Sequence, residues 1–205
     1  MRSRASASFE RLRAYVQARA TLTPEQIDFI RGLFSPRHLE KGEVLQRAGE
    51  PALYTAFVAK GCLRSYVIDD KGKVHVLAFA PEDWWLSDSA LFLDGGPSTL
   101  FIDAIEASDV LLIDHPSHQR MLDEIPAIAA AYRTGLQRLA AARDKRIISS
   151  LTASARDRYL GFAERYPTLV GRVPLRMLAS YLGMSPETLS RVRKPPSARR
   201  RRAVS

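Results

Sequence analysis

The strongest chemical signal in the sequence lies between Pro186 and Lys194, near the C-terminus. Helical spacing places Leu189 and Val192 on one side of this segment and leaves a polar side facing outward. The outward side carries Glu187, Ser190, Arg191 and Lys194. An arginine can donate to both major-groove acceptors of guanine, and a glutamate can accept from the amino group of cytosine. These residue types at this spacing indicate a helix that reads bases in the major groove.

The surrounding residues predict a helix, a tight turn and then this second helix. Residues 173–182 form a short amphipathic pattern, and Gly183 suits the left-handed conformation that reverses the chain. Ser185 is a good N-cap, and Pro186 suits the first helical position, where no amide donor is needed. Ser185, Thr188 and the free amides at the helix start can bind phosphates, which position a protein without specifying sequence. The predicted DNA-binding residues are Ser185, Glu187, Thr188, Ser190, Arg191, Arg193 and Lys194.

Positive charge is concentrated at the C-terminal end. The chain has 31 lysines and arginines against 22 acidic residues, a formal net charge of +9. Seven basic residues and no acidic residue lie between Arg191 and Ser205, which leaves +2 for the first 190 residues. Such a cluster is typical of a polyanion-binding end. We expect the arginine-rich tail, residues 197–205, to add sequence-independent phosphate contacts; a tail that only keeps the protein in solution is the alternative.

Periodicity and turn signals divide the rest of the chain. Residues 8–34 carry apolar side chains at three- and four-residue steps, which predicts two short helices. From Leu39 to Ile113, short β-branched and aromatic runs alternate with turn signals about every 8–12 residues, which predicts an all-β roll or barrel. Helical spacing resumes after His115 for about 30 residues. A further helix from Thr152 to Tyr166 is expected to bury Leu160, Phe162, Ala163 and Tyr166.

The long helical segment after His115 carries one apolar stripe, formed by Ile125, Ile128, Tyr132, Leu136 and Leu139. A stripe on a helix of this length favours a seam between two copies of the chain. Packing of the helix on its own β domain is the alternative.

Together these patterns predict an α+β fold. It has an N-terminal antiparallel β-roll (a double-stranded β-helix or jelly roll) with flanking helices, a long dimerisation helix and a C-terminal helix-turn-helix domain. The expected boundaries are 1–120 for the β-roll sensor, 121–150 for the dimerisation helix, 151–196 for the DNA-binding domain and 197–205 for the basic tail.

The order of elements resembles the Crp/Fnr family of transcription regulators over about residues 22–194. The likeness is strongest in residues 41–45, 58–64 and 104–113 and in the segment LASYLGMSPETLSRVRK. It implies a homodimer that binds double-stranded DNA and whose ligand state reorients the DNA-binding heads, with RNA polymerase as a further partner. The family's recognition helix commonly carries Arg-Glu-Thr-x-x-x-Arg. Here Pro186 replaces the leading basic residue, so the preferred DNA site should differ from that of the cyclic-AMP receptor protein.

The resemblance also implies a ligand pocket in the roll. Cyclic-nucleotide binders of the family hold the phosphate with a Gly-Glu-x-x-Leu segment and a following Arg-Ser or Arg-Thr pair. The corresponding pocket residues here are Asp88, Ser89, Ser98 and Thr99. The arginine that would make the charge-assisted contact with the phosphate is absent. We therefore predict weak or no binding of cyclic AMP and leave a small-molecule effector unassigned.

No catalytic site, metal site or resident cofactor is expected. The single cysteine, Cys62, excludes an intrachain disulfide and a four-cysteine iron–sulfur cluster within one chain. A cupin-like dioxygenase would share the β-roll, but it needs a cluster of histidine and carboxylate ligands from neighbouring strands. Only His75 lies in a predicted strand, and His115 and His118 are expected at the surface.

One further alternative is a ligand-binding or protein-interaction module whose helix-turn-helix no longer reads DNA. The positive charge of Arg191, Arg193 and Lys194 argues against it, because a helix that has lost contact with DNA has no need of that charge. Neither an apolar leader nor a run of about 18 apolar residues is present, which favours a cytoplasmic protein.

Overall fold

The computed structural model describes residues 2–88 and 96–194 and divides into two compact units, Met1–Ala141 and Ala142–Ser205. The predicted basic tail, residues 197–205, and the predicted pocket residue Ser89 lie outside the described residues. One helix, α5 (Pro126–Thr152), runs from the first unit into the second. None of the described helices is long and apolar enough to cross a membrane.

Two helices, α1 (Arg2–Gln17) and α2 (Pro24–Gly32), open the first unit. The start of α2 is fixed by a capping box, in which Thr23 and Gln26 each accept a hydrogen bond from the backbone amide of the other. The prediction of two short opening helices is confirmed, and α1 begins earlier than predicted.

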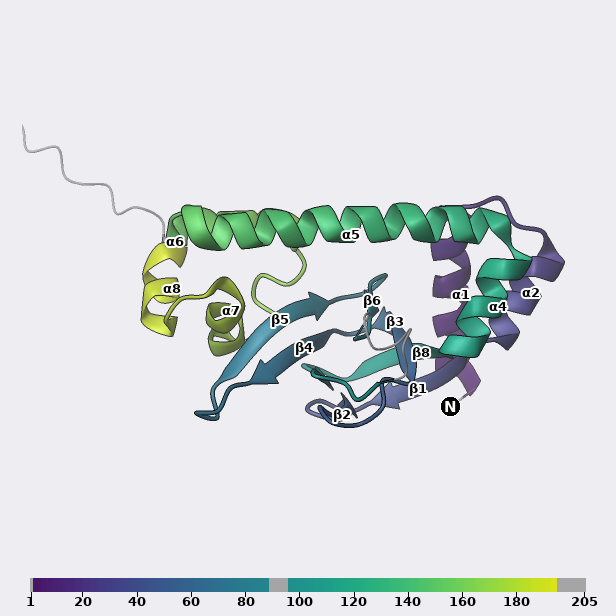
Figure 1. Ribbon diagram of the computed structural model, residues 1–205, viewed down its shortest axis with the longest axis horizontal. Helices are drawn as coiled ribbons and strands as arrows, with labels where there is room; N and C mark the ends of the chain where they lie inside the picture. The colour runs from purple at the N-terminus through teal and green to yellow at the C-terminus, as the bar shows by residue number, and fades with distance from the viewer. Residues whose placement is uncertain (1, 89–95, 195–205) are drawn as a thin grey trace, which may run out of the picture. The chain divides into compact units, whose positions relative to one another are not determined.

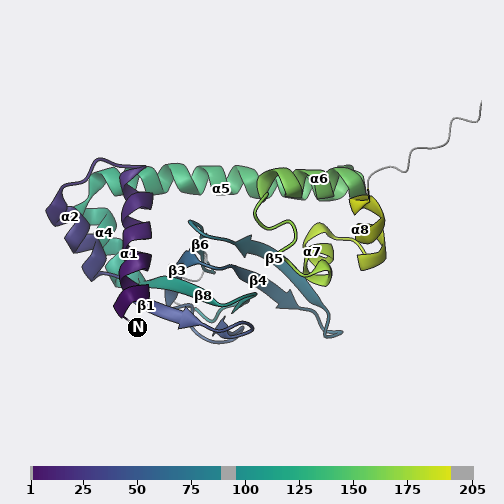
Figure 2. The same ribbon diagram turned by 180° about the vertical axis from the view of Figure 1, so that it is seen from behind.

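The β-roll consists of two four-stranded antiparallel sheets (Figures 1 and 2). One sheet has the strand order β1-β8-β3-β6 and the other β2-β7-β4-β5. The strands are β1 (Ser35–Leu39), β2 (Val44–Gln46), β3 (Tyr54–Lys60), β4 (Leu63–Ile68), β5 (Val74–Ala80), β6 (Trp85–Leu86), β7 (Phe101–Ala104) and β8 (Ser108–Asp114). The predicted roll is confirmed. The first strand of the roll pairs with the last, so that Ser35 lies opposite Leu112.

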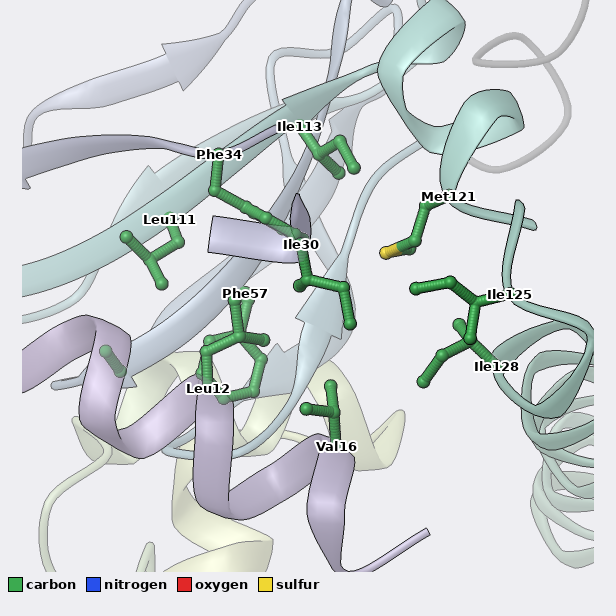
Figure 3. Close-up of a cluster of buried hydrophobic side chains, with 11 residues drawn as sticks. Leu12, Val16, Ile30, Phe34, Phe57, Leu111, Ile113, Met121, Ile125 and Ile128 are labelled. Atoms are coloured by element: carbon green, nitrogen blue, oxygen red, sulfur yellow. The ribbon is translucent and has the colours of Figure 1, made fainter. Parts of the chain in front are cut away.

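Alternate residues of β3 face two different cores, because successive side chains of a strand point to opposite faces of the sheet. Ala56 and Val58 belong to a core shared by both sheets, which fills the roll. Phe57 and Ala59 belong to a second core, which joins the sheet to the helices. In Figure 3, Leu12 of α1 lies beside Phe57 within this second cluster.

The tryptophan pair is divided between these two cores. Trp84 packs against the core of the roll. Trp85 packs against the second core, with its ring 5.1 Å from that of Phe57 and 6.0 Å from that of Tyr15. Both indole rings therefore have packing roles.

The helical stretch after the roll is divided in two, α4 (His115–Glu124) and α5. Ile125 separates them with the non-helical angles φ −128° and ψ 85°. The cause is Pro126, which has no amide hydrogen and disfavours helical conformation in the residue before it. The structure thus differs from the single uninterrupted stretch that the periodicity predicts.

The second unit contains the end of α5 and three further helices, α6 (Ala155–Arg165), α7 (Leu175–Leu182) and α8 (Pro186–Arg193). Its buried apolar residues include Phe162, Tyr166, Leu169, Val173, Leu178, Leu182 and Leu189. The expectation that Leu160 is buried on α6 is wrong: this side chain is 49% exposed, while Phe162 is 3% exposed.

Candidate nucleic-acid interface

The helices α7 and α8 are joined by a short turn at Gly183. This glycine has φ 64° and ψ 43°, the left-handed conformation that only glycine adopts without strain. The amide of Met184 donates to the carbonyl of Ala179 at 3.0 Å, and the amide of Gly183 donates to the carbonyl of Ser180 at 3.2 Å. These bonds close the end of α7, so the chain can reverse within three residues.

The start of α8 is fixed by its first residues. The side chain of Ser185 accepts a hydrogen bond from the amide of Thr188 at 3.2 Å, and Pro186 follows it at the first helical position. Both features agree with the prediction from the sequence.

One face of α8 is packed and the other is open. Leu189 is fully buried, and on α7 Leu178, Ala179 and Leu182 are buried as well. The exposed residues of α8 and its caps include Ser185, Glu187, Ser190, Arg191, Arg193 and Lys194, while Thr188 is half-buried. The structure therefore brings the seven predicted DNA-binding residues together on one helix and leaves six of them exposed.

Two of these side chains are ordered by their neighbours on the helix. Thr188 Oγ1 accepts hydrogen bonds from Arg191 Nη2 and from Ser185 Oγ, each at 3.3 Å. The pKa of Glu187 is lowered by a backbone hydrogen bond, by the Ser185 side chain and by the charges of Arg176 and Arg191. Glu187 therefore presents an ionised carboxylate, which can accept a hydrogen bond from a base or repel a phosphate.

Arg176 is a residue of this surface that the sequence reasoning missed. It lies on α7, is exposed, and its charge acts on Glu187 of α8. The available signal was the only charged residue of this short amphipathic helix, at a position that does not face the core.

Charge differs between the two units. Sixteen basic and eighteen acidic residues give residues 1–141 a net charge of −2, whereas eleven basic and four acidic residues give residues 142–194 a net charge of +7. The positive charge of the chain therefore belongs to the unit that carries α7 and α8, even without the tail.

The predicted pocket residues of the roll form a hydrogen-bonded cluster. Asp88 Oδ2 accepts from Ser98 Oγ at 3.1 Å, from the Thr99 amide at 3.2 Å and from Thr99 Oγ1 at 3.4 Å. Asp88 and Ser98 are buried. The structure thus brings three of the four predicted residues together, with a carboxylate as the acceptor for the donors of the other two.

The histidines differ in two respects from the expectation. His38 lies in β1, so His75 is not alone in the strands, and His118 is buried rather than at the surface. The His118 ring packs edge-on against Tyr132, 4.8 Å between ring centroids. Within residues 2–88 and 96–194, no three histidine, cysteine or acidic residues are grouped as a metal site would need.

Residues 36–124 match the family model described as the cyclic nucleotide-binding domain. The roll has the fold of that domain. The match begins in β1 and ends with α4, so the paired Asp88, Ser98 and Thr99 lie inside the cyclic nucleotide-binding domain and the candidate nucleic-acid interface lies outside it.

Solved structures share the fold over most of the chain. FixK2 from Bradyrhizobium japonicum matches with a TM-score of 0.66 at 20% identity, over 78% of this chain and 82% of that chain. The c-di-GMP responsive global regulator CLP from Xanthomonas campestris gives 0.64 at 16% identity, over 83% and 89%. The Catabolite Activator Protein of Thermus thermophilus gives 0.55 at 22% identity, over 84% and 82%. No curated protein sequence matches significantly.

The resemblance to Crp/Fnr regulators is therefore confirmed at the level of the fold. In this chain the cyclic nucleotide-binding domain is followed by the helices α5 to α8.

Proposed function

We propose that the protein is a dimeric DNA-binding transcription regulator of the cytoplasm, in which the cyclic nucleotide-binding domain controls a helix-turn-helix formed by α7 and α8. The open face of α8 carries the proposal. Arg191 is exposed there, while Leu189 anchors the opposite face in the core, and Arg193 and Lys194 are exposed at the C-terminal end of the helix. A helix held in this way can enter a major groove without unfolding any part of the unit.

The charge of the second unit supports DNA as the partner. A net charge of +7 over residues 142–194 attracts a polyanion and makes its binding depend on salt. The residues divide by chemistry: Arg191 and Glu187 can read base edges, whereas Ser185, Thr188 and the first amides of α8 can bind phosphates. Arg176 joins the phosphate-binding group.

The surface of α5 after Ile128 supports a dimer, whereas Ile125 and Ile128 of the predicted stripe are buried in the core of their own unit. Leu136, Leu139, Ile147 and Leu151 are 42%, 37%, 56% and 80% exposed. Ile148 is 60% exposed as well. At about 100° per residue, the five positions fall within an arc of about 180°, which is one side of the helix. One apolar side along a 27-residue helix fits a seam with a second copy. Sedimentation of the full chain should show a dimer, and Ile147→Glu should shift it to the monomer.

The cluster of Asp88, Ser98 and Thr99 argues against cyclic AMP as an effector. The Ser98 hydroxyl and the Thr99 amide and hydroxyl all donate to the Asp88 carboxylate. A cyclic phosphate that used these donors would have to displace the Asp88 carboxylate or lie beside it. Two negative charges so close together repel each other. We expect no heat of binding in a calorimetric titration with cyclic AMP, and a low-micromolar affinity would contradict this part of the proposal.

The test of DNA reading is selection of bound fragments from sheared genomic DNA at about physiological salt, followed by sequencing. The wild-type chain is compared with Arg191→Ala and with Arg156→Ala. Arg156 is an exposed arginine at the start of α6, so its variant loses the same charge away from the α8 face. Wild type and Arg156→Ala should enrich one two-fold symmetric motif with half-sites about one helical turn apart.

Arg191→Ala should lose enrichment of that motif by about tenfold to a hundredfold, the contribution of one bidentate base contact. Sequence-blind enrichment by all three chains would contradict DNA reading. It would favour a module whose helix-turn-helix no longer selects sequence.

A further inference from the structure

The C-terminal end of α5 is held by an arginine of α6. Arg158 Nη1 donates to the carbonyl oxygens of Ser150 and Ala153, each at 3.3 Å. These carbonyls lie in the last turn of α5 or just beyond it, where helical partners are lacking and the helix dipole is negative. The guanidinium therefore both satisfies the acceptors and fixes the joint between α5 and α6.

A second arginine extends from α5 to α7. The guanidinium carbon of Arg146 lies 4.7 Å from the centroid of the Tyr181 ring. Tyr181 is in turn packed edge-on against Phe162 of α6, at 5.6 Å and 64°, and against Tyr166 at the C-cap of α6, at 6.4 Å and 84°. Phe162 and Tyr166 are buried, so the Tyr181 ring is held by α6 on one side and by the cation of α5 on another.

We infer that Arg146 and Tyr181 form a lock through which α5 sets the orientation of α7 and α8. Tyr181 directly precedes Leu182, which is buried in the small core below α8, so a shift of its ring changes the position of the helix that carries Arg191. Arg146 acts in this way as a positioning residue. The inference rests on the proposed function and concerns the regulation of the same site.

A lock of this kind has a consequence for the choice of DNA. Two copies joined along α5, each with α8 fixed on its own α5, present their reading helices at one separation. Such a dimer binds both half-sites only when their spacing matches, because simultaneous binding is lost when the geometry forbids it. A dimer without the lock should accept several spacings.

The experiment compares full-length wild type, Arg146→Gln and the control Lys145→Gln, which removes the same charge from the adjacent exposed position. Each is titrated with duplexes in which the selected half-sites are kept and their separation is increased by one or two base pairs. Wild type and Lys145→Gln should lose about tenfold in affinity on the longer duplexes, and Arg146→Gln only about twofold. Equal losses in all three chains would overturn the lock.

A second measurement needs no DNA. Amide hydrogen exchange of the free protein should be faster over residues 175–182 in Arg146→Gln than in Lys145→Gln. Unchanged exchange would overturn the lock whatever the DNA result, and faster exchange with unchanged spacing dependence would reduce Arg146 to a stabilising residue. If wild type selects no symmetric motif, the proposed function fails and the spacing test cannot be made. Unchanged exchange would then overturn the lock as well, and faster exchange would show only that Arg146 stabilises α7.

Discussion

Arginine has two different uses in the two units. In residues 1–141, Arg11 binds Asp83 and Arg64 binds Asp103, each through two hydrogen bonds of 2.7 and 2.8 Å. The Arg64 pair is largely buried, with side-chain exposures of 13% and 9%. In residues 142–194, basic residues outnumber acidic ones by seven, and those of α8 are exposed. Paired arginines join segments of the first unit, whereas the exposed arginines of α8 are placed where a polyanion can reach them.

The two units also differ in the size of their cores. The first unit has one core inside the roll and another below its helices, and several of their members have no exposed surface. The second unit packs three short helices and the end of α5 around a smaller group of side chains. A larger core allows the first unit to keep its shape, while a small domain depends more on each buried residue.

The largest expected effect tests the core of the first unit. Phe57 is fully buried and contacts the rings of Tyr15 and Trp85, so Phe57→Ala should lower the free energy of unfolding of this unit by about 3–5 kcal/mol. Both tryptophans lie in this unit, and urea denaturation followed by tryptophan fluorescence therefore reports on it alone. If the urea transition followed by helical circular dichroism shifts by the same amount over its whole course, the two units unfold together. The comparison between them then fails.

A matching truncation tests the second unit. Leu189 is fully buried on α8, and Leu189→Ala should lower the free energy of unfolding of the second unit by about 2–5 kcal/mol. The tryptophan transition should stay in place, while amide exchange over α7 and α8 should become faster. Ser190→Ala, at the exposed neighbouring position, is the control and should change neither.

Two glycines sharpen the comparison at the level of the backbone. A Cβ added to Gly183 would meet open space. Gly183→Ala should therefore lower the free energy of unfolding only by the strain of an alanine in the left-handed conformation, about 1 kcal/mol. A Cβ on Gly61 would lie 2.7 Å from the carbonyl oxygen of Ala107 and 2.8 Å from the Cα of Ser108. Gly61→Ala should therefore destabilise the roll more than Gly183→Ala destabilises the second unit, and the reverse order of their thermal shifts would contradict this account.

The smallest effect concerns pH and the first unit alone. Burial lowers the pKa of His118 below its usual 6.5, and the nearby His115 lowers it further. The unfolded chain therefore binds a proton that the folded chain binds only at lower pH, and the free energy of unfolding should fall as the pH drops below about 6.5.

Urea denaturation followed by tryptophan fluorescence at about pH 7.5 and about pH 5.5 measures this change. The variant His118→Leu should show a smaller loss between the two values than wild type. An equal loss in both chains would assign the pH dependence to other groups.

The sequence was most informative where structure depends on a few neighbouring residues. The N-cap at Ser185, the turn at Gly183 and the first position of Pro186 follow from backbone rules that act within one helical turn. The break at Ile125 belongs to the same class, since Pro126 was there to predict it.

Burial was harder to predict from the sequence. Leu160 is half exposed and His118 is buried, both against expectation, because each outcome depends on which helix packs on that face. The interaction of Arg176 with Glu187 likewise joins residues of two helices.

The order of residues is enough to predict most elements of this protein, the face of α8 that carries charge and the unit in which that charge is concentrated. The folded chain is needed to see that Asp88 accepts from Ser98 and Thr99, that Arg146 lies over Tyr181 and that Phe57 and Leu12 share a core. The two sets of features differ in how far apart along the chain the interacting residues lie. Periodicity and capping act over three or four residues, whereas these contacts join segments that only the packing of the whole unit brings together.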